Sequence, residues 1–504
     1  MKITIDKKNK APIYVQIKGE IKRMIYSREL EPFELLPSER KLAEELGVNR
    51  STVLNAYREL KAEGLIDSHI GQGTQVMPVL NDVGKDEVQQ SFPISWQHML
   101  SQEALRSQDT SIIDMMKGNS KDKLISFAAG IAAPELYPIE SFEAIASIFH
   151  EHTYEPFLHT PVEGLYSFRE AICKLMERKR INKVPEEVMV LSGSQQGLDL
   201  LARNYLDVGD TVIVEEPTYL GAIQIFKAVG AKVIGVPVHN EGIRMDILET
   251  LIIKHKPKFI YSMPTFQNPS GRVMDLAHRL KLLELSYAYQ VPIIEDDAYS
   301  ELRYEGDEIP SLKTLDKKGN VLYLNTFSKC LFPGLRIGWL CAPITVIKQL
   351  SMKKQLMDLH ANSLGQRLIL DYLNMSKLEH HLSNVIKVYR NRRDIMISML
   401  NKYAPEGVRW TVPEGGFYIW CEIPETINTR SLWMRAIDAG VTYVPGEAFF
   451  TSKQGQNFIR LNFSFPSIDE IKRGVQILMK VVEESLEVTN RLSSDNKVEV
   501  NPMF

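Results

Sequence analysis

The chain has 504 residues, of which 44% are hydrophobic and 24% charged, and its formal net charge is −3. This length exceeds one ordinary hydrophobic core, so we expect roughly two to four domains. The sequence holds no apolar run of about 18 residues and begins without the apolar core of a secretory signal. Neither a membrane span nor secretion is therefore expected. The nearly balanced charge does not by itself indicate a nucleic-acid partner.

The four cysteines show no CxxC motif and no zinc-type spacing, which is typical of reduced cytosolic thiols. They are Cys173, Cys330, Cys341 and Cys421. We therefore expect a cytoplasmic protein without a metal site. Cys330 directly follows Lys329, and a packing role is favoured over redox sensing because small thiols are commonly buried.

The first predicted elements form a helix-turn-helix. Apolar residues recur at helical spacing from Pro12 to Leu30, which predicts a first helix. Ser38 can cap a second helix over residues 39–46. Gly47 then permits the tight turn that a helix-turn-helix requires.

A third helix is predicted from about Arg50 to Glu63, followed by two short strands over residues 65–76 around Gly71 and Gly73. Such a hairpin beside the third helix is typical of a wing. Polar residues at the start of the third helix can reach phosphates and base edges, as can Arg40 of the second helix. Those at the third helix are Asn49, Arg50, Ser51 and Thr52. Taken singly, Arg40 and Arg50 are equally well explained as solvated surface charges.

The whole pattern is more specific than its parts. The segment LPSERKLAEELGVNRSTVLNAYRELKAEGLI, followed by GQGT, resembles the winged helix of GntR-type regulators over residues 11–76. The resemblance implies operator binding through the third helix. It places Arg40, Arg50, Ser51, Thr52 and Gly73 near DNA. One such module covers a half-site, so a dimer on paired half-sites is also implied. We assign residues 1–78 to this DNA-binding domain.

Residues 79–123 are polar and are predicted to be a linker, with a short helix between Trp96 and Leu105. A domain over residues 124–485 is predicted to follow, with a frayed tail over 486–504.

In the large domain, apolar strand candidates alternate with helical stretches, which predicts an α/β fold with a mostly parallel sheet covered on both faces. The candidates are residues 188–193, 211–216, 232–238, 258–264, 291–297 and 321–327. Ligands of such sheets bind beyond the carboxyl ends of the strands.

Polar motifs follow these strands. Ser194 and Gln195 begin a helix that can hold a phosphate, and Tyr219 follows the second strand, where its ring can stack on a planar cofactor. Each has an ordinary alternative as a turn or a packing residue. Asp296 and its neighbour Asp297 end an apolar strand, and burying such charges without partners costs free energy. Half-burying Lys329 is costly in the same way, so a functional role is favoured for Asp296 and Lys329.

The ordered set Asn268, Asp296, Tyr299, Lys329 and Arg336 resembles that of the fold-type-I pyridoxal 5′-phosphate (PLP) enzymes, the class I/II aminotransferases, over residues 125–480. The resemblance implies that Lys329 forms the Schiff base with PLP and that Asp296 pairs with the pyridinium nitrogen. It implies that Asn268 and Tyr299 hydrogen-bond the ring hydroxyl and that Tyr219 stacks on the ring. The residues implied to hold the phosphate are Ser194, Gln195, Ser328 and Arg336.

Two further positions follow from this resemblance. Arg460 matches the arginine that takes the substrate α-carboxylate as a bidentate fork. His159 stands where the family often has a tyrosine that reaches the phosphate of the partner subunit, so that contact is in doubt here.

A winged helix of GntR type joined to an aminotransferase-like domain resembles the MocR subfamily of bacterial regulators. This resemblance implies a homodimeric transcriptional regulator that senses an amino compound or a vitamin B6 form at the PLP site. Two other hypotheses stay open. One adds real aminotransferase activity to regulation, and the other is an enzyme whose winged helix only tethers or assembles it.

Overall fold

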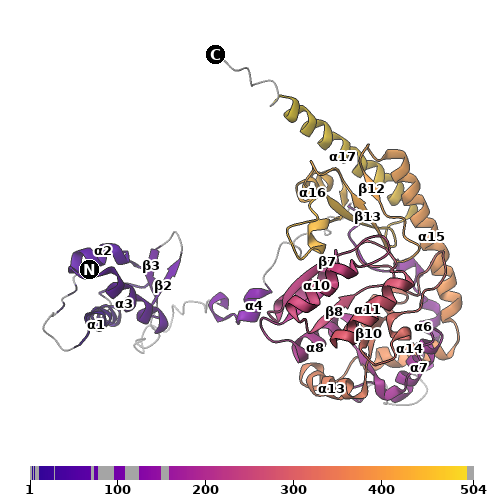
Figure 1. Ribbon diagram of the computed structural model, residues 1–504, viewed down its shortest axis with the longest axis horizontal. Coiled ribbons are helices and arrows are strands. Elements are labelled where there is room, and N and C mark those ends of the chain that lie inside the picture. Colours follow the sequence, from indigo (N-terminus) through magenta and orange to yellow (C-terminus); the bar gives the residue numbers. More distant parts are fainter. Residues whose placement is uncertain are drawn as a thin grey trace. The chain divides into compact units, whose positions relative to one another are not determined.

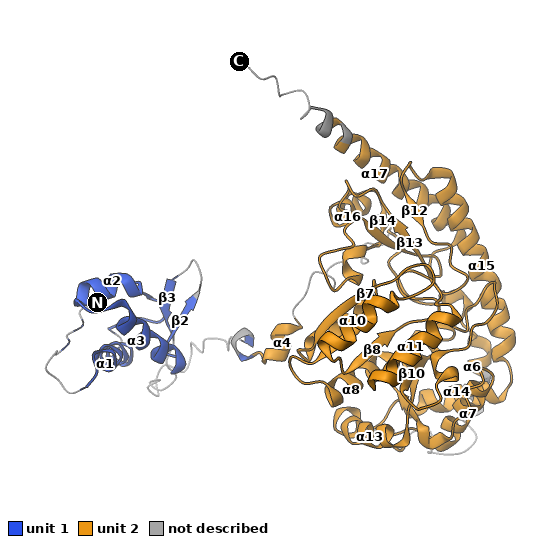
Figure 2. Ribbon diagram, viewed as in Figure 1, with its two compact units in different colours: residues 1–99 blue, residues 100–504 orange. Residues whose placement is uncertain are grey.

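The computed structural model describes residues 3, 5, 11–27, 29–69, 73–77, 96–107, 124–148 and 158–495. Its internal contacts divide the chain into two compact units, residues 1–99 and 100–504 (Figure 2). Gly71 of the predicted wing and most of the predicted linker 79–123 lie outside the described residues. No helix in the described ranges combines the length and apolar character that a bilayer crossing demands.

In its described residues, the first unit has three α-helices and a three-stranded antiparallel sheet in the order β1-β3-β2 (Figure 1). The helices are α1 (Ile13–Tyr26), α2 (Glu39–Leu46) and α3 (Arg50–Ala62); the strands are β1 (Leu35–Leu36), β2 (Ile66–His69) and β3 (Gly73–Val76). The predicted cap is confirmed, because the Ser38 hydroxyl accepts a hydrogen bond from the amide of Lys41 at 3.3 Å. Gly47 has a φ of 60°, as the turn requires.

The first helix is shorter than the sequence predicted. It ends at Tyr26 and not near Leu30. Ser27 is the C-cap residue, and its backbone amide donates the last hydrogen bond of the helix, to the carbonyl of Arg23. Leu30 is still buried in the core of the unit. Its apolar character therefore reflects packing from a loop and not continuation of the helix.

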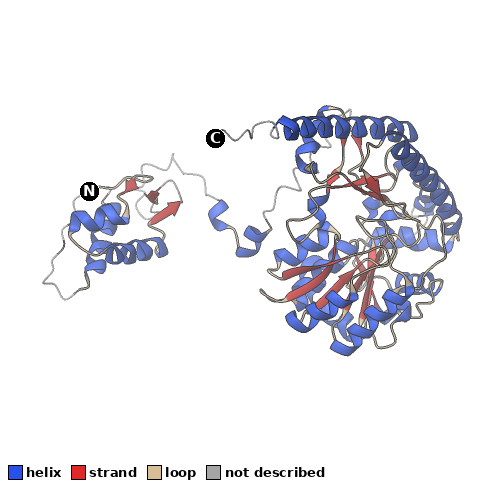
Figure 3. Cartoon of the chain, turned by 45° about the horizontal axis from the view of Figure 1, so that its top comes forward, coloured by secondary structure: helices blue, strands red, loops and turns tan. Residues whose placement is uncertain are grey.

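The second unit is built on a seven-stranded sheet in the order β5-β11-β10-β9-β8-β6-β7 (Figure 3). The strands are β5 (Val188–Leu191), β6 (Thr211–Glu216), β7 (Lys232–Pro237), β8 (Phe259–Ser262), β9 (Ile293–Asp296), β10 (Val321–Thr326) and β11 (Gly338–Cys341). Six of them were predicted as strands. β11 was not, and it alone runs antiparallel to its neighbours, β10 and β5.

Helices cover both faces of this sheet, which confirms the predicted layers. Val212 and Val214 of β6 face one apolar cluster, and Ile213 between them faces another. The helices are α6 (Ile139–Ile148), α7 (Tyr166–Glu177), α8 (Ser194–Tyr205), α9 (Leu220–Ala228), α10 (Met245–His255), α11 (Leu276–Tyr289), α12 (Leu312–Leu315), α13 (Ile344–Asp358) and α14 (Ser363–Asn374).

A smaller sheet in the order β12-β13-β16-β15 follows, joined by a short parallel pair, β4 and β14. The strands are β4 (Ile125–Ser126), β12 (Arg409–Trp410), β13 (Tyr418–Glu422), β14 (Val441–Thr442), β15 (Val444–Pro445) and β16 (Phe458–Asn462). The long helices α15 (Leu378–Tyr403) and α17 (Ile468–Asp495) lie side by side here, with α16 (Thr429–Asp438) nearby (Figure 1).

The last described helix extends past the start of the predicted tail. Helix α17 continues through the predicted start at residue 486 as far as Asp495. Leu486 packs against the main core, and Arg491 lies 3.7 Å from Glu487 one turn earlier. Packing and helical ion pairing therefore extend an element that the local sequence pattern did not reveal.

Within the predicted linker, two short helical turns are described, η1 (Trp96–Met99) and α4 (Gln102–Arg106). Helix α4 belongs to the second unit and packs on α9. The predicted helix from Trp96 to Leu105 is thus two separate turns.

Candidate PLP site and DNA-binding surface

The polar motifs singled out in the sequence gather beyond the carboxyl ends of the parallel strands. β5, β6, β8 and β9 lead into Gly193, Pro217, Met263 and Asp297, and β10 leads into a 3-10 turn, η6 (Phe327–Lys329). β6, β8, β9 and β10 are parallel neighbours, and β5 runs in the same direction beyond the antiparallel β11, so the loops that follow these strands meet at one edge of the sheet.

Asp296 ends β9 and is only 3% exposed. Its Oδ2 accepts a hydrogen bond from the Tyr261 hydroxyl at 2.9 Å, while its buried Oδ1 has no hydrogen-bond partner among the described residues. Burial, with the neighbouring charge of Asp297, raises the pKa of Asp296 to about 6. A protonated ring nitrogen would satisfy the orphaned oxygen and stabilise the carboxylate.

A candidate phosphate cradle lies at the start of α8. Gly193 has a φ of 87°, and a Cβ built there would lie 2.5 Å from Nη2 of Arg336. A Cβ at Gly338 would lie 2.9 Å from the amide nitrogen of Ser194. Nη1 of Arg336 donates to the Ser328 hydroxyl at 3.4 Å. A helix N-terminus, an arginine and a hydroxyl converging in this way favour a phosphate dianion.

Lys329 ends the 3-10 turn after β10. Its Nζ donates a hydrogen bond to the carbonyl of Gly130 at 2.6 Å and lies 5.6 Å from the ring centre of Tyr299. Burial lowers the pKa of Lys329, and the positive charge of Arg460 lowers it further. A neutral amine is the nucleophilic form that an aldehyde requires.

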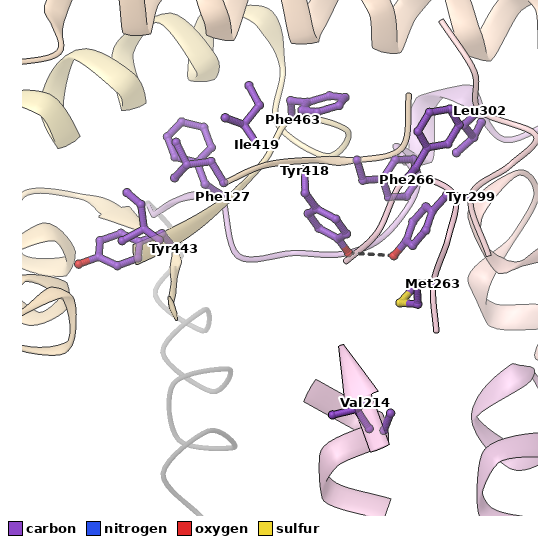
Figure 4. Close-up of a cluster of buried hydrophobic side chains, with 14 of the residues drawn as sticks. Phe127, Val214, Met263, Phe266, Tyr299, Leu302, Tyr418, Ile419, Tyr443 and Phe463 are labelled. Carbon is purple, nitrogen blue, oxygen red and sulfur yellow. Dashed lines mark hydrogen bonds between the residues drawn. The ribbon is translucent and has the colours of Figure 1, made fainter. Parts of the chain in front are cut away.

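Tyr418 of β13 belongs to the site, although sequence reasoning missed it. Its hydroxyl lies 3.1 Å from that of Tyr299, and Figure 4 shows the two hydroxyls facing one another. Burial favours the neutral phenol, but the charges of Arg460 and Lys329 outweigh it, so the pKa of Tyr418 lies below its ordinary value. Tyr418 stands in a run of apolar and aromatic residues, where nothing distinguishes it from a packing residue.

Arg460 projects from β16 into the same site and is 6% exposed. It donates to Asn268 Oδ1 and to the Ala128 carbonyl, each at 2.9 Å, and its Nε is buried without a partner among the described residues. Its guanidinium lies over the rings of Tyr418 and Phe449, at 4.2 and 4.9 Å from their centres. Asn268 is thus brought against Arg460.

Tyr219 and Gln195 are also brought together. The Tyr219 hydroxyl donates to Gln195 Oε1 at 2.9 Å, and burial raises the pKa of this tyrosine. A Cβ at Gly221 would collide with the Tyr219 ring at 2.6 Å, so the glycine leaves room for that ring.

His159 lies in a different contact. Its Nδ1 is 2.8 Å from Nε2 of His360. The other ring nitrogen of His360, Nδ1, lies 2.8 Å from the carbonyl oxygen of Ala361. The doubtful contact of His159 with a partner's phosphate stays a prediction.

The winged helix presents the predicted DNA residues at its surface. Arg40, Asn49, Arg50, Ser51 and Gly73 are exposed, and Thr52 is half-buried. The Arg50 side chain is 70% exposed and lies 3.1 Å from Glu39 of α2. Gly73 begins the second wing strand with a φ of 91°.

Two exposed residues of α3, Asn55 and Arg58, were missed in the sequence. They lie four and seven positions after Ser51, on the same helical face. That spacing was the signal that could have found them.

The fold and this set of side chains define a fold-type-I PLP domain joined to a winged helix. Residues 139–478 match the family "Aminotransferase class I and II", and residues 13–76 match "Bacterial regulatory proteins, gntR family". The chain belongs to the class I and II aminotransferase family and carries a GntR-family DNA-binding domain, the architecture of MocR-type regulators.

Relatives of two kinds are similar to it. "Uncharacterized HTH-type transcriptional regulator YdfD" of Bacillus subtilis is 32% identical over 480 residues, covering 95% of this chain and 98% of the relative. "Aromatic-amino-acid aminotransferase 1" of Thermococcus litoralis is 37% identical over 400 residues, 78% of this chain and 96% of the relative.

Among solved structures, the α-aminoadipate aminotransferase LysN of Thermus thermophilus, complexed with N-(5′-phosphopyridoxyl)-L-leucine, has a TM-score of 0.74. It is 35% identical, and the match covers 78% of this chain and 100% of that chain. The cofactor of this family is PLP, and the site fits it. The fit rests on the orphaned Asp296 oxygen, the cradle at Gly193 and the lowered pKa of Lys329.

Proposed function

We propose that the chain is a PLP-dependent transcriptional regulator that binds operator DNA through its winged helix and senses an amino compound at the PLP site. One observation carries the proposal: a complete set of cofactor-binding groups shares its chain with a DNA-binding domain. Relatives similar over nearly the whole length, such as YdfD, are named as transcriptional regulators.

The chain's own residues divide the work of holding the cofactor. The cradle of Ser194, Ser328 and Arg336 binds the phosphate, and Asp296 holds a proton at the ring nitrogen. PLP supplies an aldehyde that bonds to amines and a ring that accepts electrons. Lys329 is the amine that would hold the cofactor through this aldehyde, and burial favours its neutral, nucleophilic form.

Arg460 recognises the acidic end of the effector. Its unpartnered Nε and its Nη groups present the fork that binds a carboxylate bidentately. Asn268 accepts from Arg460 through its Oδ1, so its Nδ2 is the atom that can donate to the cofactor. The effector class is therefore an amino acid or a similar amino compound, with a B6 vitamer as the second candidate.

Regulation requires that the effector bind one arrangement of the protein better than another. We further propose that the protein acts in the cytoplasm as a homodimer, because one winged helix covers only a half-site. DNA binding of the full chain to fragments upstream of its own gene tests the regulatory function. A protein that shifts none of these fragments, with or without amines, would be no regulator of that DNA.

The second candidate is a regulator that also turns over as an aminotransferase. The intact set of Lys329, Asp296 and Arg460 favours it, since Lys329 can also move a proton during transamination. Incubation with an amino acid and a keto acid distinguishes the two. Sustained formation of new keto acid establishes turnover, and a single stoichiometric change or none supports a sensor.

A further inference from the structure

A cavity of about 700 Å³ lies against α9, and of the residues assigned to PLP only Gln195 lines it. Its walls come from Leu220, Ile223 and Gln224 of α9, from the segment 447–456, and from Arg106 of α4. A cavity of roughly 300–1,000 Å³ is the size that holds a small-molecule ligand. Gln195, which accepts the Tyr219 hydroxyl, also lines it, so this cavity shares a wall with the PLP site.

Helix α4 forms one side of the cavity and is held by two polar contacts. Nε of Arg106 donates to the carbonyl of Ala228 at 3.1 Å, at the end of α9, where a positive charge also favours the helix dipole. Glu103 lies 2.5 Å from Arg203 of α8. All four residues are in the second unit.

These contacts are few, and both are at the surface. Exposed ion pairs contribute about 1 kcal/mol or less, so α4 docks weakly and can respond to a ligand. In the sequence, α4 follows the segment that joins the two units, so the chain enters the large unit through it.

The charges of the cavity favour an anion. Its two acidic residues are already paired, Asp199 with Arg203 at 2.8 Å and Glu447 with Arg430 at 3.0 Å. Lys227 and Lys453 also line the cavity and are exposed, which leaves excess positive charge.

The remainder of the lining is largely apolar. Leu220, Ile223 and Phe450 offer hydrophobic surface beside those lysines. A ligand that matches both parts has a carboxylate at one end and an apolar body of a few carbon atoms or an aromatic ring.

We propose that this cavity is a second ligand site, separate from Arg460, that binds a small carboxylate with an apolar body and regulates the protein through α4. The ligand contacts Arg106 and Lys453 at once and so stabilises α4 in its docked state. Binding at the cavity is independent of the proposed function, whereas the effect on DNA rests on it.

The probe is 4-phenylbutyrate, which has no amino group and so cannot bond to PLP. Isothermal titration of the full-length, PLP-loaded protein is expected to show saturable binding with no change in the cofactor's absorbance. The double variant Lys227→Ala/Lys453→Ala should lower the affinity about tenfold, the effect of losing charge-assisted contacts. Gln224→Trp should obstruct the cavity and weaken binding.

Lys348→Ala is the matched control, since Lys348 is an exposed lysine of α13 that does not line the cavity. Its affinity should equal that of the unaltered protein. Absence of saturable binding overturns the proposal. Binding that Gln224→Trp does not weaken but that disappears in Arg460→Ala also overturns it, because the probe would then occupy the effector site.

The role of α4 has its own readout. Hydrogen exchange of residues 101–107 should slow when 4-phenylbutyrate binds, and Arg106→Ala should speed it without the probe. Unchanged exchange and unchanged DNA affinity under saturating probe reject transmission through α4. A protein that binds the probe but no DNA at all instead refutes the proposed regulatory function and leaves the cavity as a ligand site.

Discussion

Lys329 is the residue through which the proposed effector would act on the cofactor. Burial and the positive charge of Arg460 lower its pKa, which favours the neutral amine that bonds an aldehyde. We predict that Lys329→Ala abolishes both the absorbance of lysine-bound PLP and the response to the effector, yet leaves basal DNA binding unchanged. Spectra and DNA-binding curves of this variant check the prediction. The Lys348→Ala control should behave as the unaltered protein does. An intact absorbance band would assign the bond to another lysine.

Asp296 gives a prediction about pH in the protein freed of PLP. The pKa of its carboxyl group is raised by burial from 3.8 to about 6, so the folded state prefers the protonated form. Its favourable contribution to stability is present below about pH 4 and is lost as the pH rises through about 6. Asp296→Asn should therefore stabilise the PLP-free protein by about 2–3 kcal/mol at pH 7.5 and by little at pH 4, at 1.36 kcal/mol per pKa unit.

Denaturant unfolding at the two pH values measures this difference. The same variant should bind PLP more weakly, because the amide does not carry the negative charge that holds the ring proton. Equal stability of the variant and the unaltered protein at pH 7.5 would show that burying the ionised Asp296 carboxylate does not destabilise the PLP-free protein.

Arg50 tests the DNA interface. It lies at the start of α3, mostly exposed, and its ion pair with Glu39 is of the kind that contributes little to stability. We predict that Arg50→Ala weakens specific DNA binding by about 1–3 kcal/mol if it contacts a base, with PLP absorbance unaltered. Glu39→Ala is the matched variant, since it frees Arg50 without removing it. Equal DNA affinity of Arg50→Ala and the unaltered protein would leave Arg50 a solvated surface charge.

Among the elements, the turn between β5 and α8 is the one we propose for phosphate binding. Gly193 needs a φ of 87° and has Arg336 directly against it. Gly193→Ala should push Arg336 out of the cradle and lower PLP affinity at least about tenfold, the loss of one charge-assisted contact.

Gly209 offers a control for backbone strain. It has a φ of 94° but nothing within 4 Å of a built Cβ. Gly209→Ala should lose a similar amount of stability, about 1 kcal/mol for a residue forced to positive φ, without losing PLP. PLP titration by fluorescence separates the two variants. Equal PLP affinity in both would mean that the cradle tolerates a displaced Arg336.

At the scale of the whole molecule, the elements with strong local signals were predictable. Alternating apolar strands, the Ser38 cap and the Gly47 turn are short-range features, and the structure has each of them. The strand β11 was missed because its four residues follow a glycine and a proline turn, and only pairing with β10 and β5 makes them a strand. Burial of β-sheet residues depends on neighbours distant in sequence.

In the site, too, some residues have a local sequence signal and others depend on tertiary packing. Lys329, Asp296 and Arg460 stand in motifs, whereas Tyr418 enters the site only because β13 pairs with β16, opposite Asn462. The docking of α4 on α9 likewise depends on a carbonyl at Ala228, which no sequence pattern marks. Contacts of this kind arise from tertiary packing.

We propose that occupation of the PLP site changes DNA binding, and one titration tests this coupling directly. Amines are added to the purified, PLP-loaded protein while cofactor absorbance and the anisotropy of a labelled operator fragment are recorded on the same sample. We predict that one amine shifts the absorbance to a new, stable value and changes DNA affinity over the same concentration range. A shift in absorbance that leaves DNA affinity constant would contradict the account.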